Sequence, residues 1–334
     1  MKIIDMHCDT IMELMNTNNN IYESDNMIDI KKLQKGDYLL QCFAMFVPYV
    51  SRDEKNKENY SPFEVCHKMI DRYYQEIEKY PDFIKPAYNY QDIENNIKNN
   101  KITALLTIEE GGVCLGNIEF LRNFYRLGVR MMTLTWNFKN EIASPNIDYF
   151  SFDRNATEKP KFVPNIKDGL TEFGKEVVKE MNKLGMVIDC SHLGDKGFYD
   201  VIELSTKPIV CSHSCSRTVC NHVRNMTDDM LLKLKENSGV VGINYCRSFI
   251  KEEESEATVK DVVKHINYIK DLIGIDYIGL GSDFDGISNK DIELKDASMM
   301  NLLIEELKAQ NYTQEEIDKI THKNVLRVFK ENFK

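Results

Sequence analysis

Short apolar runs alternate with amphipathic segments along almost the whole chain, and this alternation constrains the fold more than any other feature. Apolar runs of this length predict buried strands, and segments with an apolar residue every three or four positions predict helices. Strands that are separated by helices pair in parallel, because a parallel pair needs a crossover connection. We expect eight strands, in the segments 2–7, 38–47, 102–110, 129–136, 186–192, 207–214, 239–246 and 277–285.

The helix-period segments carry start and stop signals. The segments 170–185, 226–239 and 258–274 each open at or beside a threonine that can cap a helix, and each closes near a glycine. Thr313 with Glu316 forms a capping box at the start of a later helix. These signals predict helices that follow the strands in regular alternation.

The repeated strand and helix pattern predicts an α/β fold, a (β/α)₈ TIM barrel with insertions. Such a barrel needs about 250 residues, and this chain has 334 without an obvious linker, so we expect one domain over 1–334. The surplus is expected in the segments 16–36 and 139–168. An open doubly wound sheet is the alternative, but no glycine-rich dinucleotide loop follows the first strand.

The composition indicates which classes of partner the chain can bind. A formal charge of −10 opposes binding to nucleic acid or to an anionic membrane surface, and it favours a small substrate. The chain has no apolar stretch long enough to span a bilayer, and its start lacks the pattern of a signal peptide, so we expect a cytoplasmic protein. Nine cysteines without a CxxC pair argue against a disulfide framework or a thiolate zinc site.

Metal-ligand residue types recur at the ends of separate predicted strands. His7 and Asp9 stand two positions apart, so strand alternation turns an imidazole and a carboxylate in one direction. His192 and His213 each follow a serine at the end of neighbouring strands, and neutral imidazole is a common zinc ligand. The C-terminal ends of barrel strands meet at one face, where barrel enzymes place their active sites. The sequence therefore predicts a metal site at this face.

Acidic residues at two further strand ends extend the predicted site. Glu110, in TIEEGG, is expected to bridge two cations, and Glu109 is expected to point to the opposite face. In GLGSDFDG, Asp283 is a candidate general base or proton shuttle, and Asp285 either orients neighbours or ties down the loop. Arg224 is placed to bind a substrate carboxylate, the alternative being a salt bridge to the aspartates just downstream.

Other residues and motifs exclude several chemistries. No GxSxG elbow, P-loop or HExxH helix is present, which argues against serine hydrolases, nucleotide hydrolases and thermolysin-like proteases. Cys8 lies between two candidate ligands and is a poor nucleophile. We interpret His67, His265 and His322 as structural or solvated, and His222 as structural or as a support for the site.

The chain resembles the membrane dipeptidase (renal dipeptidase) family of amidohydrolase-like metal-dependent barrels. The resemblance rests on DMHCDT, the EGG after the third strand, IDCSH, PIVCSHSCSRTVCNHVRNMTDDML and GLGSDFDG, and it extends to THKNVLRVF. It implies that His7 and Asp9 bind one zinc ion, that His192 and His213 bind the other, and that Glu110 bridges the pair. Manganese or cobalt would also suit the carboxylates.

The resemblance further implies that Arg224 binds substrate, that Asp283 transfers protons, and that the chain is of the bacterial cytoplasmic type and forms a homodimer. The family commonly has a substrate-contacting histidine after the fourth strand, whereas this chain has Trp136 in TLTWN. Asn137 is a candidate to replace that hydrogen bond and, with Trp136, to contact substrate. This departure leaves the substrate preference open.

The implied function is a zinc-dependent dipeptidase in which two metal ions share the attacking hydroxide. Asp283 would pass a proton to the leaving amine, and Arg224 would hold the terminal carboxylate of the dipeptide. Two alternatives stay open: hydrolysis of a non-peptide amide, lactone or β-lactam on the same metals, and a metal-binding homologue without turnover. Phosphoester hydrolysis ranks last, because Arg224 is the one prominent cation near an otherwise acidic site.

Overall fold

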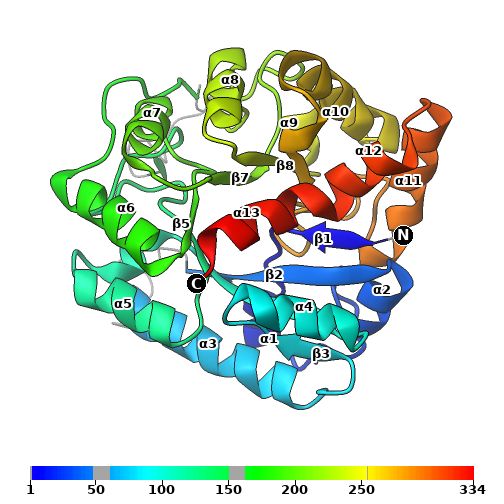
Figure 1. The fold of residues 1–334 in the computed structure, drawn as a ribbon, viewed down its shortest axis with the longest axis horizontal. Helices are drawn as coiled ribbons and strands as arrows, with labels where there is room; N and C mark the ends of the chain where they lie inside the picture. Colours follow the sequence, from blue (N-terminus) through cyan, green and yellow to red (C-terminus); the bar gives the residue numbers. More distant parts are fainter. Residues whose placement is uncertain (1, 48–60, 150–161, 254) are drawn as a thin grey trace, which may run out of the picture.

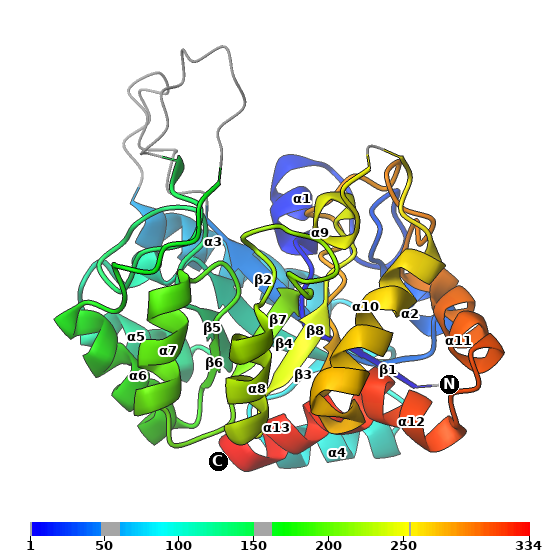
Figure 2. The ribbon, with the colours of Figure 1, turned by 90° about the horizontal axis from the view of Figure 1, so that it is seen from above.

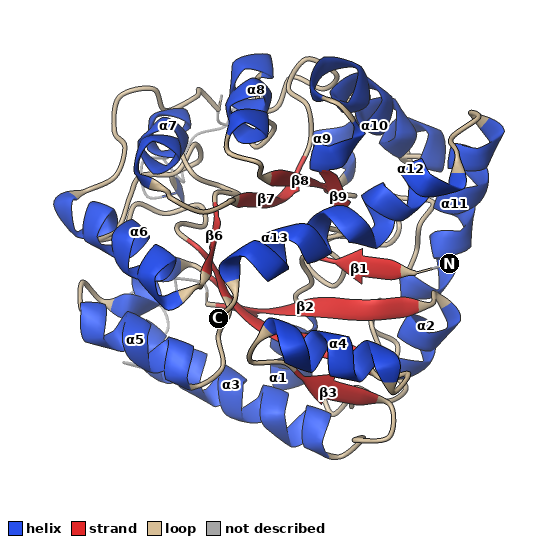
Figure 3. Cartoon of the chain, in the orientation of Figure 1, coloured by secondary structure: helices blue, strands red, loops and turns tan. Residues whose placement is uncertain are grey.

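The computed structural model describes residues 2–47, 61–149, 162–253 and 255–334. In this part of the chain, nine parallel strands form one sheet, and eight of them close into a barrel (Figure 3). The ring runs from β1 through β2, β4, β5, β6, β7, β8 and β9 back to β1, because β2 pairs with β4 and β1 pairs with β9. The strands are β1 (Ile3–Asp5), β2 (Tyr38–Phe46), β3 (Ile84–Pro86), β4 (Ile102–Glu109), β5 (Met131–Thr133), β6 (Val187–Asp189), β7 (Val210–Ser214), β8 (Val240–Ile243) and β9 (Ile278–Leu280).

The predicted (β/α)₈ barrel is confirmed, and each of the eight predicted segments contains one barrel strand. One strand, β3, was not predicted. It pairs with the first residues of β4 outside the ring, from Ile84 opposite Ile102 to Pro86 opposite Ala104. Its three residues are too few to show a periodic pattern in the sequence.

Helices surround the barrel (Figure 1). The predicted threonine caps are confirmed: Thr171, Thr227 and Thr258 each accept a hydrogen bond from the first turn of α6, α8 and α10. A capping box also opens α12 at Thr313. The helices are α1 (Thr10–Asn16), α2 (Ile30–Lys35), α3 (Pro62–Glu78), α4 (Tyr90–Lys98), α5 (Ile118–Arg126), α6 (Glu172–Leu184), α7 (Asp195–Leu204), α8 (Asp228–Glu236), α9 (Arg247–Ile250), α10 (Val259–Ile273), α11 (Met300–Ala309), α12 (Gln314–Asp318) and α13 (Asn324–Asn332).

The last helix, α13, crosses one end of the barrel (Figure 1). Its Val325, Val328 and Phe329 are buried in one cluster with Met6, just after β1, and with side chains from the barrel strands, which include Ile4, Leu40, Leu105, Met131, Val187, Val210 and Val240. Figure 2 places α1 and α9 at the opposite end from α13. One end of the barrel is thus closed by apolar packing, and the other is available for chemistry.

The two segments predicted as insertions lie between barrel elements. Residues 16–36 connect α1 to β2 and include α2. Asp285 ties this segment to the start of α1, because its carboxylate accepts hydrogen bonds from Met27 N at 2.6 Å and from Thr10 Oγ1 at 2.7 Å. Residues 139–168 lie between β5 and α6, and their part 150–161 falls outside the described residues. Among the helices described, none is both long and apolar enough to cross a membrane.

Candidate metal centre

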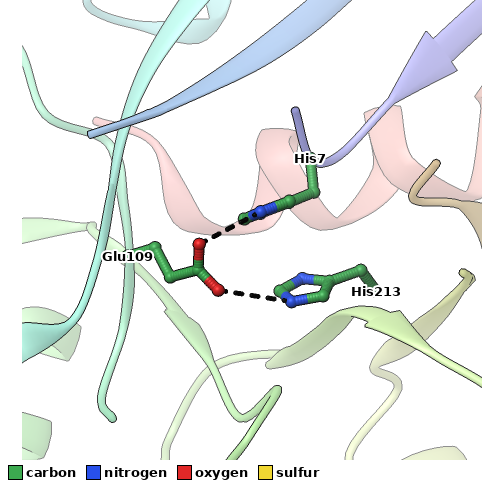
Figure 4. A group of neighbouring side chains, drawn as sticks. All are labelled: His7, Glu109 and His213. Carbon is green, nitrogen blue, oxygen red and sulfur yellow. Dashed lines mark ion pairs between the residues drawn. The ribbon is translucent and has the colours of Figure 1, made fainter. Parts of the chain in front are cut away.

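Side chains from several strand ends converge at the end of the barrel opposite α13, and three of them form the centre (Figure 4). His7 follows β1, Glu109 is the last residue of β4, and His213 lies in β7. Glu109 Oε2 lies 3.3 Å from His7 Nε2, and Glu109 Oε1 lies 3.5 Å from His213 Nε2. The two imidazole rings stack with their centroids 3.8 Å apart. All three side chains are buried, and the single carboxylate faces each of the two imidazoles with one oxygen.

Glu109 is the carboxylate that the structure brings to this centre, and the prediction that Glu110 faces it was wrong. Alternation along β4 turns Leu105 and Glu109 toward the barrel interior, and Glu110 begins the following turn at φ 89°. The Glu110 carboxylate instead accepts hydrogen bonds from Gly112 N and Trp136 N, both at 2.8 Å. A barrel strand is buried and apolar on both faces, so its sequence does not reveal which of two adjacent carboxylates points inward.

The other predicted ligands surround this centre. His192, which follows β6, places its Nε2 3.0 Å from Glu109 Oε1. Asp9 Oδ2 lies 3.5 Å from His7 Nε2, and Asp283 Oδ1 lies 3.8 Å from the same nitrogen. The structure therefore brings together these predicted residues: His7, Asp9, His192, His213 and Asp283.

Hydrogen bonds behind His192 and His213 determine which ring nitrogen faces the centre. Ser212 Oγ donates to Asp189 Oδ2 at 2.5 Å, so its only proton is used, and the hydroxyl accepts the 2.7 Å bond from His213 Nδ1. His192 Nδ1 lies 2.8 Å from Asn137 Oδ1, which can only accept, so this nitrogen also carries a proton. Each Nε2 then presents a lone pair, and the two Nε2 atoms lie 2.9 Å apart. Imidazoles held in this tautomer are suited to bind metal.

The electrostatics of the centre favour a bound cation. Burial, with repulsion from Glu109 and Asp283, raises the pKa of Asp9 to about 7, although His7 opposes this shift. Burial lowers the pKa of His192 to about 4, so this ring is neutral at pH 7. His7 Nε2 and Asp9 Oδ1 are buried and have no hydrogen-bond partner in the described chain. Buried carboxylate and imidazole atoms of this kind are a donor set that fits metal ions.

A cleft of about 190 Å³ opens onto the centre. Trp136 forms part of its wall, and its ring packs edge-on against Phe46 with the centroids 4.8 Å apart. Both acidic and aromatic side chains therefore line the cleft. It is lined by Asp9, Met12, Phe46, Glu109, Trp136, Asn137, His192, Cys246, Phe249, Asp283, Gly286 and Ile287.

Arg224 lies buried beside the cleft. Its Nη2 donates to His213 O at 3.1 Å, and its guanidinium carbon lies 5.3 Å from the centroid of the Phe249 ring. Its Nε has no hydrogen-bond partner among the residues described, and no ion pair joins it there to the downstream aspartates. His222 Nδ1 accepts a hydrogen bond from Arg224 N at 3.2 Å, and its ring packs on Phe249 at 4.6 Å. Arg224 is thus a buried cation with a free N–H group near the centre.

Buried aspartates behind the ligands form a repeated arrangement that the sequence analysis missed. Asp5 at the end of β1 accepts hydrogen bonds from Ser282 N at 2.8 Å and Ser282 Oγ at 2.6 Å. Asp189 at the end of β6 accepts from Ser212 N at 2.8 Å and Ser212 Oγ at 2.5 Å. Each aspartate joins its strand to the next strand of the barrel. Two features of the sequence could have indicated this arrangement. One is an apolar run that ends in aspartate, IID or VID, and the other is a serine just before a candidate site residue.

Comparisons with known proteins identify the family of the chain. A family model described as membrane dipeptidase (peptidase family M19) matches residues 1–333. Dipeptidase aclJ of Aspergillus oryzae is 33% identical over 304 residues, which cover 90% of this chain and 69% of that protein. Dipeptidase tcpJ of Claviceps purpurea is 31% identical over 307 residues, which cover 91% of this chain and 69% of that protein.

Solved structures share the fold. The dipeptidase AC, a metallo peptidase of family M19, superimposes with a TM-score of 0.87 at 24% identity, covering 100% of this chain and 99% of that chain. A metallo peptidase from Rhodobacter sphaeroides, liganded with a phosphinate mimic of the dipeptide L-Ala-D-Ala, gives a TM-score of 0.86 at 23% identity with the same coverage. The chain belongs to the membrane dipeptidase family, peptidase family M19.

Proposed function

We propose that the chain hydrolyses the peptide bond of dipeptides with two metal ions held at the described centre. The observation that carries the proposal is the position of Glu109, whose two oxygens face His7 on one side and His192 and His213 on the other. Relatives named as dipeptidases, and the dipeptide mimic bound by the Rhodobacter sphaeroides metallo peptidase, support a dipeptide as substrate.

In this proposal His7 and Asp9 would hold one ion, His192 and His213 would hold the other, and Glu109 would serve as a ligand to both. Zinc suits the imidazole nitrogens, and manganese or cobalt would also suit the carboxylates. Metal bound here would supply a water of lowered pKa and polarise the scissile carbonyl. The chain itself keeps these ligands buried and oriented before substrate arrives.

Asp283 is proposed to carry the proton to the leaving amine. Asn244 Nδ2 donates to Asp283 Oδ2 at 3.0 Å, which leaves Oδ1 on the side of His7. Burial raises the pKa of Asp283, with a further contribution from Glu109. A carboxylate whose pKa is raised by burial accepts a proton more readily than an exposed one, and it can release that proton later in the turnover.

Arg224 is proposed to bind the terminal carboxylate of the dipeptide. Its buried guanidinium has an unpartnered Nε beside the cleft, and a carboxylate pairs strongly with a guanidinium that is removed from water. Trp136 and Phe46 are proposed to pack against a substrate side chain.

The test is hydrolysis of L,L- and L,D-dipeptides, with metal content counted before chelation, after chelation and after zinc is restored. We expect two metals per chain and cleavage that returns with zinc. Asp283→Asn is expected to lower kcat by about 10²–10⁴-fold with the metals retained, whereas Asp71→Asn on the exposed surface of α3 is the matched control.

Other outcomes would contradict the proposal in distinct ways. Cleavage of lactones or β-lactams without cleavage of any dipeptide would favour the non-peptide hydrolase. Two metals without turnover of either class would favour a binding protein. A chain that binds no metal would contradict the assignment of the centre.

A further inference from the structure

We propose that Asn137 is a positioning residue that holds His192 toward the metal centre, and that Glu110 anchors the loop that presents Asn137. The inference rests on the proposed function of the centre, and it concerns residues that stand behind the ligands. Its basis is a continuous path of hydrogen bonds from the end of β4, through the loop after β5, to His192.

His192 depends on a side-chain contact for its orientation because no regular strand holds it. Strand β6 ends at Asp189, and His192 adopts φ 68°, in the left-handed region that most residues avoid. Its Nδ1 donates to Asn137 Oδ1 at 2.8 Å, and this contact turns Nε2 toward Glu109 Oε1, 3.0 Å away. An amide oxygen can only accept, so Asn137 selects both the tautomer and the ring orientation that metal binding needs.

Glu110 fixes the loop on which Asn137 stands. It is fully buried and adopts φ 89°, a conformation that costs free energy for a residue with a side chain. Its carboxylate compensates by accepting from Gly112 N at 2.8 Å, Trp136 N at 2.8 Å and Asn140 Nδ2 at 2.5 Å. Because Trp136 directly precedes Asn137, one of these bonds fixes the backbone just before the amide that binds His192.

Asn140 fixes the other side of the same loop. Its Nδ2 also donates to Leu134 O at 2.9 Å, and its Oδ1 accepts from Ile142 N at 2.8 Å and Ala143 N at 3.0 Å. The segment that carries Asn137 is therefore held before and after it. The two adjacent glutamates therefore have different roles. Glu109 faces the centre, and Glu110 orders the loop that supports His192.

The first experiment compares Asn137→Ala with Asn137→Asp. Zinc affinity is measured by competition with a chelator, and ligand geometry is followed by the visible absorption spectrum of the cobalt-loaded protein. We expect Asn137→Ala to weaken the binding of one of the two metal ions by about 10- to 100-fold and to change the spectrum of the cobalt-loaded protein. Asn137→Asp should restore both, because a carboxylate also accepts from His192 Nδ1. Asn332→Ala is the control. Asn332 is a buried asparagine of α13 whose side chain donates hydrogen bonds to Pro208 O and Val328 O.

The second experiment tests the anchor with Glu110→Gln, which keeps the volume but places an amide N–H₂ among groups that only donate. We expect a weaker affinity for the same ion, and no further loss when Asn137→Ala is added, because both changes act through His192. Additive losses in the double variant would overturn the role of Glu110.

An Asn137→Ala variant whose affinities and cobalt spectrum stay within about twofold of wild type would overturn the inference, since support behind a ligand is expected to matter more. These measurements use metal without substrate. A chain that binds two ions and shows the expected loss, yet cleaves no dipeptide, would therefore contradict the proposed function while supporting the role of Asn137.

Discussion

Gly286 shows how closely single atoms are fitted around the centre. A Cβ atom at this position would lie 2.1 Å from Asp9 Oδ2 and 2.8 Å from Asp283 Oδ1. We therefore expect Gly286→Ala to displace the Asp9 carboxylate and to weaken metal binding by about tenfold or more, as loss of a well-placed ligand contact would. Chelator competition with zinc measures the effect.

Gly169→Ala is the matched control for this change. Gly169 lies just before α6, far along the chain from Asp9, and its added Cβ would meet another carboxylate, Asp200 Oδ2 of α7, at 1.9 Å. We expect a loss of stability of about 1–3 kcal/mol from overpacking and unchanged zinc affinity. Equal zinc affinity in Gly286→Ala and Gly169→Ala would show that Asp9 does not bind the metal.

The ring of Trp136 is expected to influence which substrate side chains the cleft accepts. Its side chain lines the cleft while its backbone N–H binds Glu110, so Trp136→Ala removes the aromatic wall and keeps the loop bond. We expect the kcat/KM ratio of a leucine-containing dipeptide over Gly-Gly to fall about tenfold, in line with the lost apolar contact. Parallel losses for both dipeptides, measured as kcat/KM, would mean that the ring acts on the metal centre and does not select the side chain.

The sequence was informative about the site where two ligand types stood at short, regular spacing. The pairing of His7 with Asp9, and the serine before His192 and before His213, led to residues that the structure brings together. The choice between adjacent glutamates failed, because both faces of β4 are buried. Asn137 was predicted to contact substrate, and its bond to His192 depends on two loops whose approach no local pattern encodes.

His265 links α10 to the end of α9 and to the residues just after β7. Its Nε2 donates to Ile250 O at the end of α9 at 2.9 Å, and its Nδ1 accepts from Ser216 N, just after β7, at 3.1 Å. The ring was interpreted as structural or solvated, and the structure shows it fully buried. It must stay neutral to accept at Nδ1, and burial lowers its pKa to about 4.

This pKa sets a pH window for stability. In the unfolded chain this histidine takes up a proton near its ordinary pKa of about 6.5, whereas in the folded chain it does so only near pH 4. The neutral ring therefore contributes its full share of the unfolding free energy above about pH 6.5, and this contribution is lost as the pH falls toward 4. We expect His265→Gln to abolish this component. The difference in unfolding free energy between wild type and variant should shrink by about 3 kcal/mol between pH 7 and pH 4. Denaturant unfolding at several pH values measures it, and a constant difference would contradict the assignment.

Elements were easier to predict than contacts between them. Apolar runs gave the eight barrel strands, and threonine and glycine signals gave α6, α8 and α10, because both kinds of signal act within a few residues of chain. The ties between strand ends were not predictable in this way. Asp5 and Asp189 bind serines on neighbouring strands, and such partners are chosen by the closed sheet and not by local sequence.

The two ends of the barrel have separate tasks. The strand ends at one end of the barrel bring His7, Glu109 and His213 together (Figure 4), whereas α13 packs Val328 and Phe329 into the opposite end. Barrel enzymes commonly divide chemistry and stability between their two ends in this way. A change under α13 should therefore affect the unfolding free energy without reaching the ligands.

Phe329→Ala tests this separation. Phe329 is fully buried in the apolar cluster at the α13 end and stacks on Phe333 with the centroids 5.0 Å apart, so its removal leaves a cavity. We expect the unfolding free energy to fall by about 3–5 kcal/mol, with zinc affinity and kcat of the folded fraction unchanged. Denaturant unfolding and chelator competition on the same preparation measure the two quantities. Loss of zinc binding while the barrel is still folded would show instead that packing under α13 positions the ligands, and that the two ends are coupled through the strands.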